Sequence, residues 1–236
     1  MSTSSPFMQF HEGLLRQGPG LPEDVGWAVG VAGAVGAGRV LDAGCGAGAD
    51  IPALLAEMPG AEVVAVDTHG PLVERVAREH PQRVTAVHAS MDAPEGPFDF
   101  IWCAGAIYFL GVTEGLRAFA SKLSPGACVA FSEPVWTTDT PSPASVENWA
   151  DYPPMTAMEG LEARVEAAGY ELLGSRLLPP EAWAAYYDPQ DAWIAELTPG
   201  ADAEMAKVLE VAAREAAVAR EYADEFTYAL LVVRPR

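Results

Sequence analysis

The segment Arg39-Val40-Leu41-Asp42-Ala43-Gly44-Cys45-Gly46-Ala47-Gly48-Ala49-Asp50 decides the fold of this chain. A short apolar run leads into a glycine-rich turn, and an apolar helical pattern from Ile51 to Ala56 follows the turn. Glycines at alternate positions let the backbone come close to a ligand where a side chain would collide. The following helix directs unpaired N–H groups and the positive end of its dipole toward the same point. The segment therefore predicts a strand–turn–helix unit that holds a cofactor.

The glycines alone leave two cofactor classes open. Gly44, Gly46 and Ala49 fit the G-x-G-x-x-G/A pattern of dinucleotide-binding folds. Asp42 and Gly48 extend the same residues to D-x-G-x-G-x-G. A carboxylate at the strand end attracts a cationic ligand and repels a pyrophosphate. The longer pattern therefore favours a site for a cofactor with a cationic group over a site for a dinucleotide.

Composition and charge narrow the class of partner. The chain has 236 residues, of which 50% are hydrophobic, so it is long enough for one α/β domain with a full core. Its 14 Lys and Arg residues face 33 Asp and Glu residues, a formal net charge of −19. This charge repels phosphate backbones and anionic bilayers. We expect no nucleic-acid partner and no membrane partner, which leaves a small-molecule substrate, and we leave a homodimer open.

The cysteines and histidines favour a reduced protein without a metal. Three cysteines lie in or beside strand-like apolar runs, as expected of buried thiols in a cytoplasmic protein: Cys45, Cys103 and Cys128. The four histidines are scattered and show no zinc-ligand spacing. The first six residues lack the charged and apolar regions of a signal peptide. These observations predict a cytoplasmic location.

Apolar runs and helical patterns alternate downstream of the glycine turn. We predict strands at 40–41, 61–67, 84–88, 98–103 and 127–133, with helices at 51–58, 72–80 and 115–123 and a turn at Ser124-Pro125-Gly126. This alternation predicts a parallel, doubly wound sheet. Asp67 ends the second strand 19 positions after Gly48, a spacing typical of a carboxylate that binds ribose hydroxyls.

The flanking segments predict additions around this sheet. Residues 1–38 read as a leader of two helices, 7–15 and 23–35, around Arg16-Gln17-Gly18-Pro19-Gly20, and we interpret the leader as a lid. Segments 134–158 and 179–222 read as cap insertions, separated by a helix (158–168) and a strand (170–178), and residues 226–233 form a last strand at or near a sheet edge. Aromatic residues of the insertions suggest a roofed apolar pocket for the acceptor, although each alone is more typical of packing: Trp136, Trp149, Tyr152, Trp183, Tyr186, Tyr187, Trp193 and Tyr222.

The order of these motifs resembles the class I S-adenosylmethionine-dependent methyltransferases over residues 16–236. The resemblance is strongest to a bacterial branch of small-molecule methyltransferases, through Arg16–Gly20, Ser90-Met91-Asp92, Gly105–Tyr108 and Ser132-Glu133 before Trp136. It implies one domain with a doubly wound, mostly parallel seven-stranded sheet. The implied strand order is 3-2-1-4-5-7-6, with the last strand antiparallel and a helical cap.

The resemblance also implies a cofactor, S-adenosylmethionine, and the residues that bind it. The expected cofactor-binding residues are Arg16, Gln17, Asp42, Gly44, Cys45, Gly46, Asp67, Thr68, Ser90, Met91 and Cys103, with His69 and Asp92 nearby. Glu133 and Tyr108 are the expected catalytic residues, near the ends of the fifth and fourth strands. Relatives carry glutamate where this chain has Ala104. An NAD-dependent oxidoreductase and a non-catalytic S-adenosylmethionine-binding protein are the alternatives.

Overall fold

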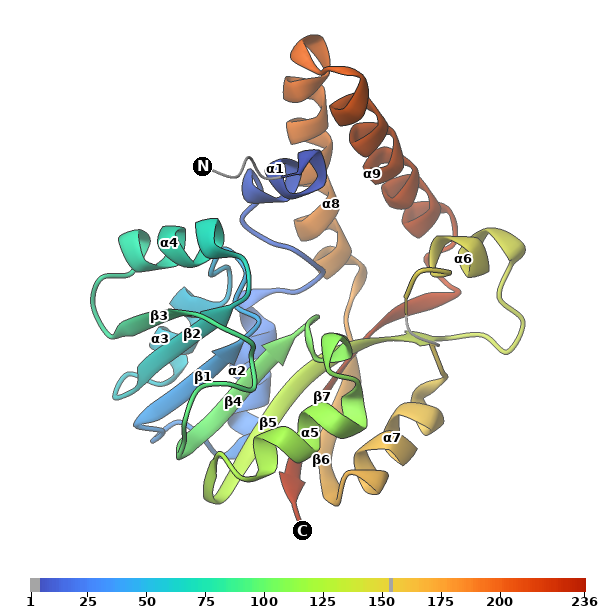
Figure 1. Cartoon of the computed structure of the whole chain (residues 1–236). Coiled ribbons are helices and arrows are strands. Elements are labelled where there is room, and N and C mark those ends of the chain that lie inside the picture. The colour runs from blue at the N-terminus through green and yellow to red at the C-terminus, as the bar shows by residue number, and fades with distance from the viewer. Residues whose placement is uncertain (1–4, 153–154) are drawn as a thin grey trace.

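Seven strands form one sheet in the computed structural model, which describes residues 5–152 and 155–236 (Figure 1). The spatial order is β3-β2-β1-β4-β5-β7-β6, as predicted. β7 runs antiparallel to both of its neighbours, while the other strand pairs are parallel. The strands are β1 (Arg39–Ala43), β2 (Glu62–Asp67), β3 (Val84–His88), β4 (Phe98–Ala104), β5 (Leu123–Trp136), β6 (Tyr170–Leu177) and β7 (Phe226–Pro235). The predicted α/β fold class is confirmed.

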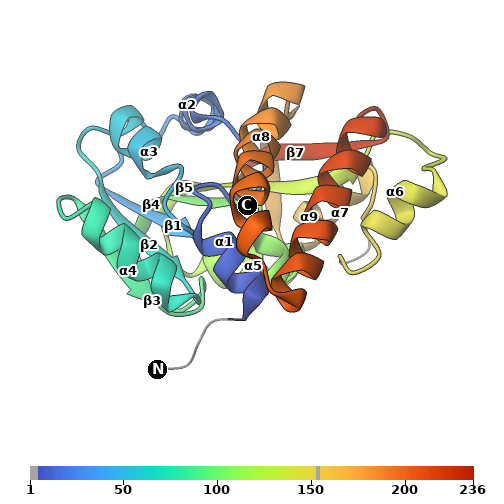
Figure 2. The same cartoon turned by 90° about the horizontal axis from the view of Figure 1, so that it is seen from above.

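Helices cover both faces of the sheet (Figure 2). The apolar sides of α2 (Pro22–Ala32) and α3 (Ile51–Glu57) pack on one face, and α4 (Gly70–Glu79) joins them through Val76. Two helices, α5 (Val112–Ala120) and α7 (Met158–Ala167), pack on the opposite face. The central strands are apolar on both sides because each side contacts a helix layer.

The fifth strand is longer than the sequence predicts. Leu123 already pairs with Phe98, so the Ser124-Pro125-Gly126 segment, predicted as a turn, lies within β5. At its other end β5 continues to Trp136 because β7 supplies hydrogen-bonding partners as far as Phe226. β7 itself lies between β5 and β6, one position from the sheet edge.

The leader divides into two helices with different surroundings. α2 belongs to the layer that covers the sheet. The shorter α1 (Pro6–Glu12) lies above the sheet, beside α9 (Ala203–Glu221) (Figures 1 and 2). Phe10 and Leu14 are buried there against Leu209 and Ala212. The break between the helices therefore carries the chain from the cap down to the sheet.

The cap is built mainly from a helical hairpin. α8 (Pro180–Leu197), the 3₁₀ turn η2 (Thr198–Gly200) and α9 rise above the sheet (Figure 1), and α6 (Pro143–Asn148) lies beside them. A second 3₁₀ turn, η1 (Ile107–Phe109), follows β4. Within the described residues, no helix is both long and apolar enough to span a membrane.

Candidate functional site

A cavity of about 660 Å³ opens where β1, β2 and β4 end, beneath α1. The carboxyl ends of parallel strands are where open α/β sheets bind ligands. The cavity is also within the size range of ligand sites. Its lining includes ten of the residues predicted for cofactor binding, together with Tyr108: Arg16, Gln17, Asp42, Gly44, Cys45, Gly46, Asp67, Thr68, Ser90 and Met91.

The glycine turn forms the floor of the cavity. Gly44, Gly46 and Gly48 have positive φ angles of 79°, 52° and 83°, which glycine adopts without strain. The backbone N–H groups of Gly44 and Cys45 both donate to the carbonyl oxygen of Val66, which fixes the turn on β2. A Cβ atom added to Gly46 would lie 3.1 Å from Cγ of Gln17. At Gly44 and Gly46 the turn therefore presents its backbone to the cavity.

Asp67 is held at the edge of the cavity by two backbone donors. Its Oδ2 accepts from the N–H of Gly46 at 2.9 Å, and its Oδ1 accepts from the N–H of His69 at 2.8 Å. A carboxylate oxygen accepts more than one hydrogen bond, so both oxygens retain capacity toward a ligand. The position is the one expected of a residue that binds two vicinal hydroxyls.

Two more carboxylates and one guanidinium lie deeper in the cavity. Asp42 is 3% exposed, and its Oδ2 has no hydrogen-bond partner among the described residues. Burial, followed by the nearby Asp50 and Asp67, raises the pKa of Asp42 well above its usual range. Asp50 accepts from Nη2 of Arg16 at 2.6 Å and from Nε1 of Trp102 at 2.9 Å. This part of the cavity has an excess of acidic groups and so favours a cationic ligand.

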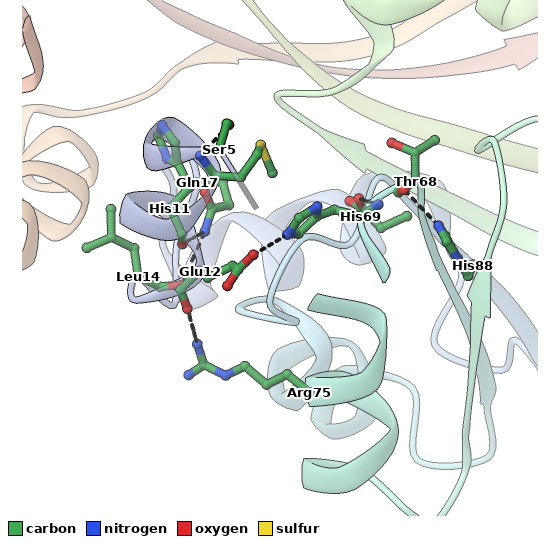
Figure 3. A network of polar contacts seen from close by, with 11 residues as sticks. Ser5, His11, Glu12, Leu14, Gln17, Thr68, His69, Arg75 and His88 are labelled. Atoms are coloured by element: carbon green, nitrogen blue, oxygen red, sulfur yellow. Dashed lines mark hydrogen bonds and ion pairs between the residues drawn. The ribbon is translucent and has the colours of Figure 1, made fainter. Parts of the chain in front are cut away.

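A polar network attaches α1 to the rim of the cavity (Figure 3). The Glu12 carboxylate lies 2.8 Å from Nε2 of His69, which precedes α4. The guanidinium of Arg75 donates to the backbone carbonyls of Glu12 and Leu14. Gln17 donates from its side chain to the carbonyls of His11 and Leu14. Contacts from α4 and from the leader itself thus hold α1 over the cavity.

The segment after β3 contributes Ser90 and Met91 to the cavity wall. The Ser90 hydroxyl donates to the carboxylate of Asp92, which lies outside the lining. Cys103 also lies outside the lining: its side chain is fully buried and directs Sγ toward the sulfur of Met91. The structure therefore places Cys103 behind the wall of the cavity, where its side chain touches Met91 instead of a ligand.

The two expected catalytic residues occupy different positions. Tyr108 lines the cavity, and burial and the nearby Glu133 raise the pKa of its hydroxyl to about 12. Glu133 is 3% exposed and lies outside the lining. Burial raises the Glu133 pKa to about 7, an effect partly offset by the Tyr152 hydroxyl and Arg164, and its Oε2 has no hydrogen-bond partner among the described residues. Only Tyr108 is therefore placed to contact a ligand directly.

The aromatic residues of the cap lie apart from the cavity described above. Most of its aromatic residues pack against one another around Phe226, as in the edge-to-face pair of Trp149 and Phe226 with centroids 5.4 Å apart. Trp193 packs instead with Phe10 and donates to its carbonyl. None of these residues lines the cavity. The contacts of these residues are those of packing in a helical cap, and an acceptor pocket formed by them stays a prediction.

Several lining residues were not predicted from the sequence. They include Asp50 and Trp102, and on the outer side Phe7, Met8, His11, Leu15, Phe109 and Leu110. Asp50 is the last residue of the glycine-rich segment 39–50, and Trp102 lies in β4. The sequence position of each residue could therefore have placed it at the cavity. Phe109 and Leu110 follow the predicted residue Tyr108 after β4, whereas Phe7, Met8, His11 and Leu15 reach the cavity only through the docking of α1. No group of three or more metal-ligating side chains occurs among the described residues.

Comparisons with known proteins give a consistent picture. Residues 23–174 match the family model described as "Methyltransferase domain". An uncharacterized protein of Synechococcus is 36% identical over 115 residues, which cover 44% of this chain and only 27% of that longer protein.

Solved structures resemble the whole chain. S-adenosylmethionine-dependent methyltransferases from Geobacter sulfurreducens and Thiobacillus denitrificans, both in complex with S-adenosyl-L-homocysteine, have TM-scores of 0.82. They are 20% and 19% identical to this chain, and each comparison covers 100% of both chains. YjhP from E. coli has a TM-score of 0.78 at 20% identity, covering 98% of this chain and 99% of its own. At these identities the likeness establishes the fold.

Proposed function

Because this chain belongs to the methyltransferase domain family, we propose that it transfers a methyl group from S-adenosylmethionine to a small organic acceptor. The observation that carries the proposal is the cavity itself, in which a side-chain-free glycine turn meets Asp42, Asp50, Asp67 and Arg16. When bound, S-adenosylmethionine supplies an electrophilic methyl group on a sulfonium cation.

The residues at the floor of the cavity fit this cofactor. Gly46 gives the ligand access to the backbone of the turn. Asp67 has lone pairs available for both ribose hydroxyls. The unpartnered Oδ2 of Asp42 suits the cationic aminoacyl end, and Arg16 suits its carboxylate. The ammonium group and the carboxylate of the methionine portion would therefore each face a side chain that can bind it.

The wall of the cavity fits the nucleoside. Thr68 and His69 follow Asp67, beside the expected ribose, and Met91 offers a soft apolar surface to a flat base. Ser90 presents its hydroxyl nearby, while its bond to Asp92 holds the segment in place. The Geobacter and Thiobacillus structures, which contain S-adenosyl-L-homocysteine, give this assignment further support.

Positioning is the main task of the protein in this reaction. Because a sulfonium methyl group is already electrophilic, the acceptor atom needs in-line placement at roughly 3 Å and exclusion of water. We assign water exclusion to α1, which the Glu12–His69 contact holds at the rim. Tyr108 orients the acceptor through its hydroxyl, and its pKa of about 12 keeps that hydroxyl protonated near pH 7.

Glu133 is assigned a supporting role behind Tyr108. The Glu133 carboxylate is buried, and its pKa of about 7 allows it to take up a proton at neutral pH, as a proton acceptor must. Since Glu133 lies outside the cavity lining, we assign it no direct contact with the acceptor; its charge helps to raise the pKa of the Tyr108 hydroxyl. The in-line displacement itself requires no base when the acceptor atom is already a free nucleophile.

Methyl transfer to a panel of hydroxyl, amine, thiol and carbon acceptors tests the proposal. We expect S-adenosylhomocysteine to form with at least one acceptor, and much more slowly with the Tyr108→Phe variant. Tight binding of S-adenosylhomocysteine without turnover on any acceptor would favour the non-catalytic alternative, for which Ala104 in the lining is the supporting observation. Binding of NAD in its place would favour the oxidoreductase.

A further inference from the structure

The deep and outer parts of the cavity differ in chemistry. Its deep part contains Asp42, which is almost fully buried, together with Asp50 and Arg16. Its outer part is lined by apolar side chains that come from two separate segments, the α1 region and η1 with the residue after it: Phe7, Met8, Leu15, Phe109 and Leu110. A ligand that fills both parts meets charge at one end and hydrocarbon at the other.

Three of these outer side chains are unusually exposed for their size. Phe7 is 57% exposed, Leu15 is 53% exposed and Phe109 is 70% exposed. Single exposed apolar residues are ordinary, but these three share the lining of one cavity. The similarly exposed Val211, at 57%, lies on α9 outside the lining. An apolar patch at the mouth of a cavity is a binding surface for an apolar molecule.

The lining offers an anionic molecule no free cation. Arg16, the one Arg or Lys among the described lining residues, is paired with Asp50 and is assigned to the cofactor carboxylate, and Asp67 adds a further carboxylate. The polar groups of the outer part are the Tyr108 hydroxyl and the His11 ring. Burial lowers the pKa of His11, whose Nδ1 has no hydrogen-bond partner among the described residues. The outer part therefore offers neutral polar groups and no free cation.

From this division we infer that the acceptor is a molecule with an apolar body and no anionic group. Its body packs against Phe7, Leu15 and Phe109, and its nucleophilic heteroatom points inward past Tyr108. The inference rests on the proposed function, since it assigns the second substrate of the same cavity. It makes the three apolar residues determinants of acceptor specificity.

Calorimetry with a homologous series of phenols tests the apolar body without requiring turnover. The full chain, saturated with S-adenosylhomocysteine, is titrated with 4-methyl-, 4-ethyl- and 4-propylphenol, and with 3-(4-hydroxyphenyl)propionate. We expect affinity to rise about three- to fourfold with each added methylene, the increment for burying one CH₂ group. The propionate has the same ring and chain length with a carboxylate in place of the methyl group, and we expect it to bind at least tenfold more weakly than 4-propylphenol.

Variants of the exposed residues test whether these side chains cause the dependence of affinity on chain length. Combined replacement Phe7→Ser, Leu15→Ser and Phe109→Ser should abolish the dependence on chain length, while Val211→Ser, matched in exposure, should preserve it. Affinities that do not change with chain length, equal binding of the propionate, or chain-length dependence retained in the triple variant would each overturn the inference. S-adenosylhomocysteine titrated alone separates the two claims, because its failure to bind overturns the proposed function instead.

Discussion

Gly46 is the residue on which access to the cofactor depends most directly. Its φ of 52° and its 3.1 Å clearance from Gln17 leave no room for a branched side chain at the cavity floor. Gly46→Val should therefore abolish calorimetric binding of S-adenosylhomocysteine while the far-ultraviolet circular dichroism stays that of the wild type. Gly30→Ala is the matched control, because its added methyl group meets no atom within 4 Å. Unchanged affinity in folded Gly46→Val protein would refute the assignment of the turn.

Asp67 provides a second test at a single residue. Removing its carboxylate takes away hydrogen bonds to the ribose hydroxyls, and hydrogen bonds to charged groups contribute about 1.5–3 kcal/mol. We expect Asp67→Ala to weaken binding of S-adenosylhomocysteine by that amount. Wild type should bind the 2′-deoxyribose analogue more weakly than the parent compound, whereas the variant should bind both alike. If the variant still discriminates between the two, another residue binds the hydroxyl.

Glu133 makes the stability of the fold depend on pH. Its pKa of about 7 in the folded chain lies above the ordinary 4.5, so the folded state holds the proton more tightly than the unfolded chain does. The contribution of Glu133 to the free energy of unfolding is therefore largest below pH 4.5 and is lost as the pH rises through 4.5 to 7, a change of about 3 kcal/mol.

Urea denaturation of wild type and Glu133→Gln across pH 4.5–8 measures this contribution. Asp42 is present in both proteins, so its own titration cancels in the difference between the two curves. The wild-type free energy of unfolding should fall relative to that of the variant as the pH rises. Parallel pH profiles would show that Glu133 has an ordinary pKa in the folded chain.

At the scale of elements, α1 and the segment after it connect the cap to the cavity. Arg16 lines the cavity from this segment and lies 2.6 Å from Asp50. If Arg16 also pairs with the cofactor carboxylate, Arg16→Ala should weaken S-adenosylhomocysteine binding about tenfold or more, the effect of losing a charged hydrogen bond.

The companion ligand 5′-methylthioadenosine lacks that carboxylate, so its affinity should barely change in the Arg16→Ala variant. Arg78→Ala removes an exposed positive charge elsewhere and controls for the change in net charge. Equal losses for both ligands, or no loss for either, would contradict the role assigned to Arg16.

The elements that were predictable are those with a local signal. Asp42, Gly44, Gly46 and Gly48 define the turn by their spacing alone, and the apolar run before Asp67 identifies β2. The extension of β5 had no such signal, because Ser124-Pro125-Gly126 has turn chemistry and lies in an irregularity between the pairs Phe98–Leu123 and Phe100–Cys128; the first of these pairs with β4 makes the segment part of the strand. Pairing between distant segments overrides local preference, and the sequence does not display it.

The same distinction applies to the site. Residues adjacent to the glycine turn or to the ends of β2 and β3 follow from the strand order. Phe7 and Leu15 reach the cavity only because Phe10 and Leu14 dock α1 against α9, roughly 200 positions away in the chain. The aromatic residues of the cap could be found in the sequence, but their packing partners, such as Phe226, depend on the tertiary fold and could not be predicted.

At the scale of the whole molecule, charge and architecture act together. The net charge of −19 and the carboxylates of Asp50 and Asp67 in the cavity have the same sign, so both the long-range field and the local site favour a cationic ligand. The sheet order brings the ends of β1, β2 and β4 together beneath α1, and no local part of the chain forms the cavity alone.

Titration of the wild-type chain with S-adenosylhomocysteine and, separately, with NAD distinguishes a methyl-donor site from a dinucleotide site. Both ligands carry an adenosine, so the comparison isolates the aminoacyl end from the pyrophosphate and nicotinamide end. We expect saturable one-to-one binding of S-adenosylhomocysteine and no binding of NAD, because the pyrophosphate would lie among Asp42, Asp50 and Asp67. Binding of NAD without binding of S-adenosylhomocysteine would contradict the assignment of this cavity to a methyl donor.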